Sequence, residues 1–415
     1  MRERLPPALR ERDFSLLWAT NVVAGLATQM ILVAVGWQVY AIHRDPLDLG
    51  LIGLVEFVPL LLLALPAGQL ADVVPRRAII AVSLAMEVGI ALLLLAVTIA
   101  GGRTLWPYLA LAAASGVAAG ISAPALRALL PETVPTEMMA GAMALRSVGW
   151  QIAVVAGPAV GGIIFEVSPK LLYALSAGLF VGGLGCVLAL DKRPAARAPG
   201  SGAPGWQSLI EGVSFLRRSR MVLGAILLDL FAVLFGGAIA LAPVFARSIL
   251  QVGPVGLGAL RTAPAVGALL AALMLTRRPL RNSAGPTLLV VVALFGVCMV
   301  VFGLSKWLPL SLAALAVAGF VDMISVNIRS TTIALVTPNE LRGRVTAVEM
   351  VFISASNELG AFESGVVAAA VGTVTSVVAG GIATIGIALS WTRLFPSLAH
   401  LGRLEDLRPE PVRVG

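Results

Sequence analysis

Histidine and cysteine are nearly absent from this chain of 415 residues, which contains only two of each. Cys186 and Cys298 each fall within an apolar segment and indicate neither a disulfide framework nor a metal site. The two histidines, His43 and His400, form no HExxH zinc motif, and no Gly-Lys pair of a phosphate-binding loop occurs. We therefore predict no catalytic constellation, no metal site and no nucleotide site, which argues against an enzyme and against an ATP-driven pump.

Charged residues are also scarce, at 13% of the chain, whereas 58% of the residues are hydrophobic. A soluble core cannot enclose that much apolar surface, so the chain needs lipid as its solvent. Strands of alternating polarity are missing as well, and every backbone polar group in a bilayer must be satisfied within the protein. The predicted fold is therefore an all-α integral membrane protein.

Twelve apolar segments are long enough to cross a bilayer, which takes about 20 residues. An offset of 203 residues places Gly53-Leu54 on Gly256-Leu257 and Pro135-x-Glu137 on Pro338-x-Glu340. The repeat predicts two pseudo-symmetric halves of six helices each, an architecture typical of secondary transporters. The predicted spans are residues 14–40, 48–72, 77–100, 105–128, 139–165, 170–190, 219–246, 251–275, 284–304, 307–331, 345–370 and 373–394.

The chain divides into four parts on this prediction: an N-terminal half at 1–190, a linker at 191–218, a C-terminal half at 219–394 and a tail at 395–415. The linker begins with a Pro-, Ala- and Gly-rich stretch, which is typical of flexible connections. It ends in an amphipathic interfacial helix. We predict that Trp206, Phe215 and Leu216 dip into the lipid boundary there, while the adjacent arginines meet anionic head groups.

Basic residues indicate the orientation, because they accumulate on the cytoplasmic side of membrane segments. Most of the 30 lysines and arginines fall in the termini, the linker and alternate loops. We therefore predict that both termini and the linker are cytoplasmic. The same rule accounts for the net charge of +8, so no nucleic-acid partner is expected. No cleavable signal peptide is predicted before the first span. The opposite loops hold only Arg44, Arg103, Lys170, Arg247 and Lys306.

Acidic residues inside the spans point to a mechanism, because a charge in mid-bilayer costs at least ~2.5–3.5 kcal/mol. A carboxyl group that takes up a proton on one side and releases it on the other can couple transport to a proton gradient. Asp229 has no basic neighbour in the sequence. Asp322 has Arg329 two turns along the same helical face, as an ion pair or as a functional site. The proton-coupling candidates are Asp229, Asp322, Glu358 and Glu363.

Polar side chains within the spans are candidates for contact with a solute. Amides and an indole among apolar walls can hold an amphipathic molecule without demanding one chemistry. Each of these side chains can equally well form a hydrogen bond between helices. The substrate-cavity candidates are Asn21, Gln29, Trp37, Gln38, Asn327, Arg329 and Asn357.

The loop after the second span reads GQLADVVPRR, over residues 68–77. It resembles the signature loop of the major facilitator superfamily, although Val73 and Pro75 depart from that pattern. The resemblance implies a conformational latch between helical bundles. A pair of basic residues that only marks the end of a span is the alternative. The latch candidates are Gly68, Asp72, Arg76, Arg77, Arg127, Arg342 and Arg344.

A glycine-rich motif lies in the span at 139–165, where Gly157, Pro158, Gly161 and Gly162 fall within one hexapeptide. It resembles the glycine-proline motif of exporters in the same superfamily, and so implies export; a generic packing seam of small residues is the alternative. The runs LLPETVPTEMMAGAMALRSVGWQ and LVTPNELRGRVTAVEMVFISASNELG resemble the subgroup of enterobactin exporters and multidrug or macrolide efflux proteins. The resemblance covers essentially the whole chain but does not identify a substrate.

We therefore expect a transporter of the bacterial inner membrane that exports a small amphipathic molecule, drug-like or siderophore-like, by proton antiport. The proton gradient is its expected energy source, without a cofactor, and a monomer is its expected state. An uncoupled facilitator, an importer and a lipid carrier of the same fold are the nearest alternatives. A non-transporting sensor or scaffold and a membrane enzyme are alternatives from other classes.

Overall fold

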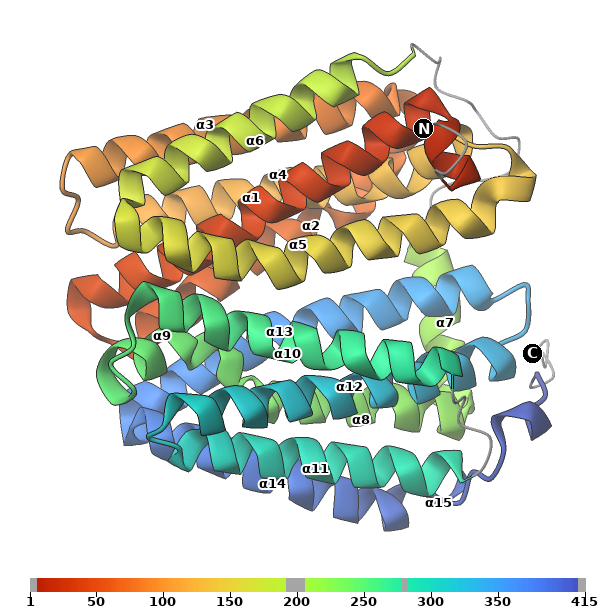
Figure 1. The fold of residues 1–415 in the computed structure, drawn as a ribbon. Helices are drawn as coiled ribbons and strands as arrows, with labels where there is room; N and C mark the ends of the chain where they lie inside the picture. Colours follow the sequence, from red (N-terminus) through yellow and green to blue (C-terminus); the bar gives the residue numbers. More distant parts are fainter. Residues whose placement is uncertain (1–5, 192–205, 278–282, 410–415) are drawn as a thin grey trace. The chain divides into compact units, whose positions relative to one another are not determined.

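The computed structural model describes residues 6–191, 206–277 and 283–409, without the side chains of residues 64, 65, 72 and 206–210. The predictions for the flexible linker at 192–205 lie outside the described residues. So do those for the side chains of Asp72 and Trp206. Within the described ranges all regular secondary structure is helical, which confirms the predicted fold class (Figure 1).

Six long helices precede the linker, in the order that the sequence predicts. The other helices follow it. The first six are α1 (Arg12–His43), α2 (Pro46–Val73), α3 (Arg76–Ile99), α4 (Trp106–Leu129), α5 (Met139–Val167) and α6 (Pro169–Leu188). The others are α7 (Trp206–Arg218), α8 (Arg220–Gly236), α9 (Ala242–Val244), α10 (Gly253–Arg277), α11 (Ala284–Leu304), α12 (Leu308–Val336), α13 (Arg342–Val371), α14 (Thr373–Leu394) and α15 (Pro396–Ala399).

Among the described residues, eleven helical segments are long and apolar enough to cross a membrane. The remaining long helix, α13, is not among them, because its glutamate and asparagine side chains lower its mean hydropathy. With α13 counted, the predicted number of twelve spans is reached. The protein is therefore a multi-pass membrane protein.

The seventh span is not the regular helix that the sequence predicts over 219–246. Helix α8 ends at Gly236, and a 3₁₀ turn at Ala238–Leu241, the short α9 and a π turn at Phe245–Ile249 complete the span. Leu241 and Phe245 are fully buried. Irregular backbone at membrane depth is tolerated where protein covers it, so packing explains why this span can be broken.

The chain forms two compact units that do not coincide with the halves of the sequence. Unit 1 comprises Met1–Arg44, Leu54–Ala203 and Val252–Thr262. Unit 2 comprises Asp45–Gly53, Pro204–Gln251 and Ala263–Gly415. The first turns of α2 therefore belong to unit 2, and the first turns of α10 belong to unit 1.

Unit 1 is organised around α1, which packs against α5 and α6, while α3 packs against α4 and α6. Apolar side chains on these inward faces form its core, with Phe14, Ile80 and Phe180 almost completely buried. In a bilayer, close approach of helices depends on small residues and on van der Waals contact. The glycines of α5 described below fit that requirement.

In unit 2, α11 packs against α12 and α14, and α8 packs against α13 and α14. Helix α7 also belongs to this core. Phe215 is 9% exposed and Leu216 is 3% exposed, in a cluster with residues of α8, α11 and α13. The prediction that these two side chains dip into lipid is therefore wrong: they bury their apolar area against unit 2.

The segment predicted as a cytoplasmic tail is largely packed as far as Leu404. Leu398 is fully buried, and Leu401 and Leu404 are each less than a tenth exposed. The backbone N–H groups of Ala284 and Gly285 donate to the carbonyls of Gly402 and Leu401, at 2.8 and 2.9 Å. This C-terminal segment thus satisfies two of the free N–H groups at the start of α11.

Candidate functional site

A buried ion pair joins two helices of unit 2. Arg329 Nη1 on α12 lies 2.6 Å from Asp229 Oδ1 on α8, and their side chains are only 8% and 11% exposed. Arg329 Nε also donates to the hydroxyl of Ser325, one turn earlier on α12, at 3.2 Å. The sequence pairs Arg329 with Asp322, whereas the structure pairs it with Asp229.

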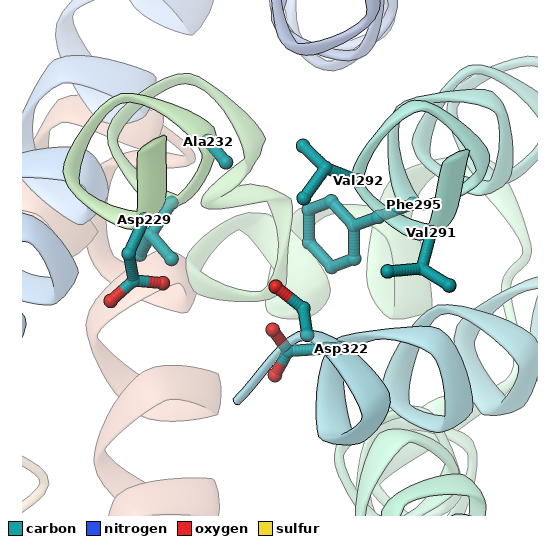
Figure 2. Close-up of a pocket in the computed structure, with 8 residues that line it drawn as sticks. Asp229, Ala232, Val291, Val292, Phe295 and Asp322 are labelled. Carbon is teal, nitrogen blue, oxygen red and sulfur yellow. The ribbon is translucent and has the colours of Figure 1, made fainter. Parts of the chain in front are cut away.

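Asp322 and Asp229 line the same small cavity, as Figure 2 shows. The cavity measures about 20 Å³, which is room for about one water molecule. It is much too small for a drug-sized solute. The lining residues are Asp229, Ala232 and Val233 of α8, Val291, Val292 and Phe295 of α11, and Asp322 and Ser325 of α12.

Glu349 on α13 adds a third acid to the site. It interacts electrostatically with both Arg329 and Asp229, and Asp322 interacts with the same two residues. We call Asp229, Asp322, Arg329 and Glu349 the charge cluster. One guanidinium thus pairs with one carboxyl group and interacts electrostatically with two more.

The charge cluster has no counterpart in the first half of the sequence. The offset of 203 residues maps Asp229, Asp322 and Arg329 onto Leu26, Ala119 and Leu126, and it maps Glu349 onto a residue of opposite charge, Arg146. Only Ser325 retains its type, as Ser122. The repeated fold therefore carries this set of ionisable groups on one side of the repeat only.

The other two coupling candidates lie further along α13. At 1.5 Å per residue, Glu358 and Glu363 are about 13 and 21 Å from Glu349 along the helix axis. Both are half-buried. The Glu358 carboxylate lies 2.8 Å from where a Cβ on Gly53 would be, and Glu363 forms a hydrogen bond with Ser364.

Gln38 is the centre of a hydrogen-bond network in unit 1. Its Oε1 accepts from the hydroxyls of Tyr173 on α6, at 2.6 Å, and Tyr108 on α4, at 3.4 Å. Its Nε2 donates to Thr98 on α3, at 3.2 Å. Gln38 therefore joins four helices through hydrogen bonds, and its contact with a solute stays a prediction.

The remaining cavity candidates are spread over three helices. Asn21 on α1 donates to the Arg146 carbonyl at 3.4 Å, and Asn357 on α13 donates to the carbonyl of Ile353 at 2.9 Å. Gln29, Trp37 and Asn327 are half-buried. Their contact with a solute stays a prediction.

Three of the five basic residues in the predicted latch, Arg76, Arg77 and Arg342, contact the end of a helix within their own unit. Arg76 binds Glu132 and donates to the carbonyl of Ala128 at 3.0 Å. Arg342 donates to the carbonyl of Ala334 at 3.2 Å, and Arg344 pairs with Glu211 of α7. Gly68 lies within α2, and the Arg127 side chain is exposed.

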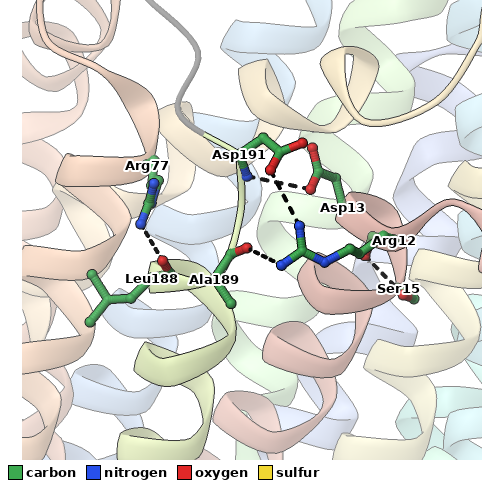
Figure 3. A network of polar contacts seen from close by, with 7 residues as sticks. All are labelled: Arg12, Asp13, Ser15, Arg77, Leu188, Ala189 and Asp191. Carbon is green, nitrogen blue, oxygen red and sulfur yellow. Dashed lines mark hydrogen bonds and ion pairs between the residues drawn. The ribbon is translucent and has the colours of Figure 1, made fainter.

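Arg77 acts together with Arg12 at the end of α6, as Figure 3 shows. Arg77 donates to the carbonyl of Leu188, and Arg12 donates to the carbonyl of Ala189 at 3.0 Å. Arg12 also pairs with Asp191 at 3.2 Å. The last carbonyls of a helix lack partners within it and carry partial negative charge, so two guanidinium groups stabilise this end.

The glycine-proline motif lies where α5 touches two other helices of unit 1. A Cβ on Gly157 would lie 2.5 Å from Gln29 Cβ, and one on Gly161 would lie 2.9 Å from Met30 Cα. A Cβ on Gly162 would lie 2.6 Å from the carbonyl oxygen of Pro254 on α10. The motif therefore lets α5 pack directly on backbone.

A matching seam occurs in unit 2. A Cβ on Gly365 would lie 3.0 Å from the Pro46 carbonyl oxygen and 3.1 Å from Gly50 Cα. The packing thus matches Pro46-x-x-x-Gly50 with Pro254-x-x-x-Gly258, an offset of 208 residues. At these two helix starts the matching residues are 208 positions apart, five more than the sequence offset of 203.

Comparison with known proteins supports this architecture. The transmembrane secretion effector family of the major facilitator superfamily matches residues 5–403. The chain belongs to this family. Among solved structures, this major facilitator chain is similar to a bacterial homologue of the human lysosomal transporter Spinster, at 14% identity and a TM-score of 0.72, over 93% of this chain and 98% of that one. It is also similar to a POT family transporter, at 10% identity and a TM-score of 0.74, over 94% and 97%.

Three similar curated proteins are bacterial. The multidrug efflux pump Tap of Mycolicibacterium fortuitum is 26% identical to this major facilitator chain, over 86% of it and 89% of Tap. The enterobactin exporter EntS of Escherichia coli is 28% identical, over 71% and 70%. The MFS-type transporter YfiS of Bacillus subtilis is 25% identical, over 67% and 68%. The chain is therefore a membrane transporter of the major facilitator type.

Proposed function

We propose that this protein exports a small amphipathic molecule across the bacterial inner membrane in exchange for protons, by alternating access. The charge cluster is the observation that supports coupling. With one base against three acids, the cluster balances its charge within an apolar bundle only when it also holds protons. Binding and release of a proton here would therefore favour different conformations.

The direction of transport rests on two further observations. Two relatives that span most of this chain are named as an efflux pump and an exporter. The glycine-proline motif of α5 resembles that of exporters. Its glycines form a seam in which two helix backbones are in contact. The proposal includes a proton gradient as the energy source without a cofactor, a monomer, and both termini in the cytoplasm.

The substrate needs contacts outside the cavity of the charge cluster, because that cavity holds about one water molecule. Asn21, Gln29, Trp37, Asn327 and Asn357 are the side chains proposed for this role. Separating the proton site from the substrate site allows each ligand to shift the conformational balance through its own differential affinity.

Efflux from a pump-deficient bacterium tests the proposal. Cells expressing the protein are loaded with a panel of dyes, macrolides and catecholate siderophores, with and without a protonophore. We expect protonophore-sensitive loss of at least one compound, abolished by Asp229→Asn and retained by Glu137→Gln, an exposed acid outside the charge cluster. Loss of a compound that ignores the protonophore would contradict proton coupling.

The alternatives differ in what drives the flux in vesicles of purified protein. A facilitator equilibrates its substrate whatever the pH gradient, and an importer runs in the opposite direction with the same gradient. A lipid carrier moves a fluorescent phospholipid between leaflets. A sensor, scaffold or enzyme moves none of these compounds, even when the vesicles are shown to contain the protein.

A further inference from the structure

Asp322 stands beside an ion pair without being part of it. Asp322 and Arg329 are seven residues apart on α12, so they share one face of the helix two turns apart. Arg329 nevertheless pairs with Asp229 on α8, at 2.6 Å. Within the described ranges, the Asp322 carboxylate has neither a hydrogen bond nor an ion pair to another residue.

Ser325 explains why Arg329 contacts one acid and not the other. Its hydroxyl accepts a hydrogen bond from Arg329 Nε at 3.2 Å, and the serine is only 4% exposed. A guanidinium is a rigid planar fork, so a contact that fixes Nε also fixes the direction of Nη1. Ser325 thereby holds Nη1 in the position from which it pairs with Asp229 on α8.

The surroundings of Asp322 are polar on one side and apolar on the other. The charged groups that interact with it are Asp229 on α8 and Arg329 on α12, and Glu349 on α13 interacts with the same two residues. Helix α11 contributes only apolar side chains to the cavity, Val291, Val292 and Phe295 (Figure 2). The Asp322 carboxyl therefore borders a space large enough for one water molecule, through which a proton can arrive.

We infer that Ser325 is a positioning residue for coupling: it holds Arg329 on Asp229 and so leaves Asp322 as the carboxyl that carries the transported proton. The inference rests on the proposed function of proton antiport. In each cycle the Asp322 carboxylate forms one O–H bond with a proton delivered by water. It breaks that bond when water on the other side takes the proton, and no other covalent bond changes.

Infrared spectra of the purified full-length protein test which acid is protonated. The protein is reconstituted in phosphatidylethanolamine and phosphatidylglycerol vesicles, and the C=O stretch of protonated carboxyl groups is followed as the pH is lowered. We expect a titrating band that Asp322→Asn removes and that Glu137→Gln, an exposed acid outside the charge cluster, retains. A band of full amplitude in Asp322→Asn would overturn the assignment.

The role of Ser325 has its own signature in the same titration. In Ser325→Ala, Arg329 is free to reach Asp322, so the band should titrate about 1 pH unit further toward acid. Ser325→Thr, which restores the hydroxyl, should return the midpoint to that of the unaltered protein. Arg329→Lys keeps the charge but lacks the planar fork, and should give the same acid shift if Ser325→Ala does not fold. An unchanged midpoint in both variants would exclude the positioning role.

These spectra need no substrate, so they separate two failures. If the band behaves as expected but no pH gradient drives flux in vesicles, the proposed antiport fails and the protonation site stands. If gradient-driven flux is present and Asp322→Asn leaves it intact, Asp322 is not the proton carrier, although the antiport stands.

Discussion

The carbonyl oxygen of Pro158 lies 2.4 Å from the position that a Cβ on Gly258 would occupy. Helices α5 and α10 touch at this point through their backbones, and Gly258 also approaches Gly162 Cα. A carbonyl oxygen cannot turn aside as the end of a flexible side chain can. The seam therefore tolerates glycine and no larger residue at position 258.

Gly258→Ala should lower stability by about 1–3 kcal/mol, because the added methyl group forces two helix backbones apart. Thermal unfolding of the detergent-solubilised protein measures the loss. Gly178→Ala is the matched control, because nothing lies within 4 Å of its Cβ position on α6. If both variants unfold at the same temperature, the two helix backbones are not in close contact at Gly258.

Gln38→Leu should destabilise unit 1, because the hydroxyls of Tyr108 and Tyr173 lose their hydrogen-bond acceptor. Tyr173 is completely buried and loses its acceptor, and one unsatisfied buried group costs about 1–3 kcal/mol. The measurement is again thermal unfolding. Thr28→Val serves as a control, since Thr28 is exposed and bonds only within α1. A substrate residue would instead change KM for efflux with stability intact.

Substituting one residue of the Asp229–Arg329 ion pair should reduce stability more than substituting both. Asp229→Asn or Arg329→Met alone leaves a buried charge without its partner, with an expected loss of about 3–5 kcal/mol. The double variant removes both charges and should recover most of that loss, even though transport is abolished. A double variant whose loss equals the sum of the two single losses would show that the two groups do not interact.

Truncation should distinguish the packed C-terminal segment from the residues after it. Ending the chain at Leu394 removes buried Leu398 and the two carbonyls that cap α11, so the truncated protein should be poorly stable or fail to accumulate. Ending it at Pro409 keeps these contacts and should leave stability unchanged. Fluorescence-detected size exclusion of tagged chains compares the two.

The fold was accessible from the sequence because it is dictated by long apolar segments. Lipid leaves helices as the available spanning structure, and the boundaries follow within a few residues, as with 139–165 against Met139–Val167. The broken seventh span was not predicted. Its irregular part has the same apolar composition as a helical span, so composition does not reveal the break. Burial of this part, as at Phe245, permits the break.

The charge cluster was accessible in part. Composition identifies Asp229, Asp322 and Arg329 as ionisable groups in membrane segments, and helical spacing identifies the pair on α12. Which acid Arg329 chooses depends on α8, a hundred residues earlier in the chain, and on the direction set by Ser325. Spacing within one helix carries no information about either contact.

The same limit applies to α7. Its amphipathic pattern indicates one apolar face, but the pattern is the same whether lipid or protein covers that face. Packing decides the matter for Phe215 and Leu216, which α8, α11 and α13 help to enclose.

The cap on α11 has a consequence for the order of synthesis. A ribosome makes Ala284 and Gly285 more than a hundred residues before the carbonyls of Leu401 and Gly402 that receive their N–H groups. During that interval the start of α11 lacks these two partners, so unit 2 reaches its final form only when the last stretch of chain has left the ribosome. A chain that ends before residue 402 lacks at least one of these carbonyls, so the start of α11 stays without that partner however long the chain is given to fold.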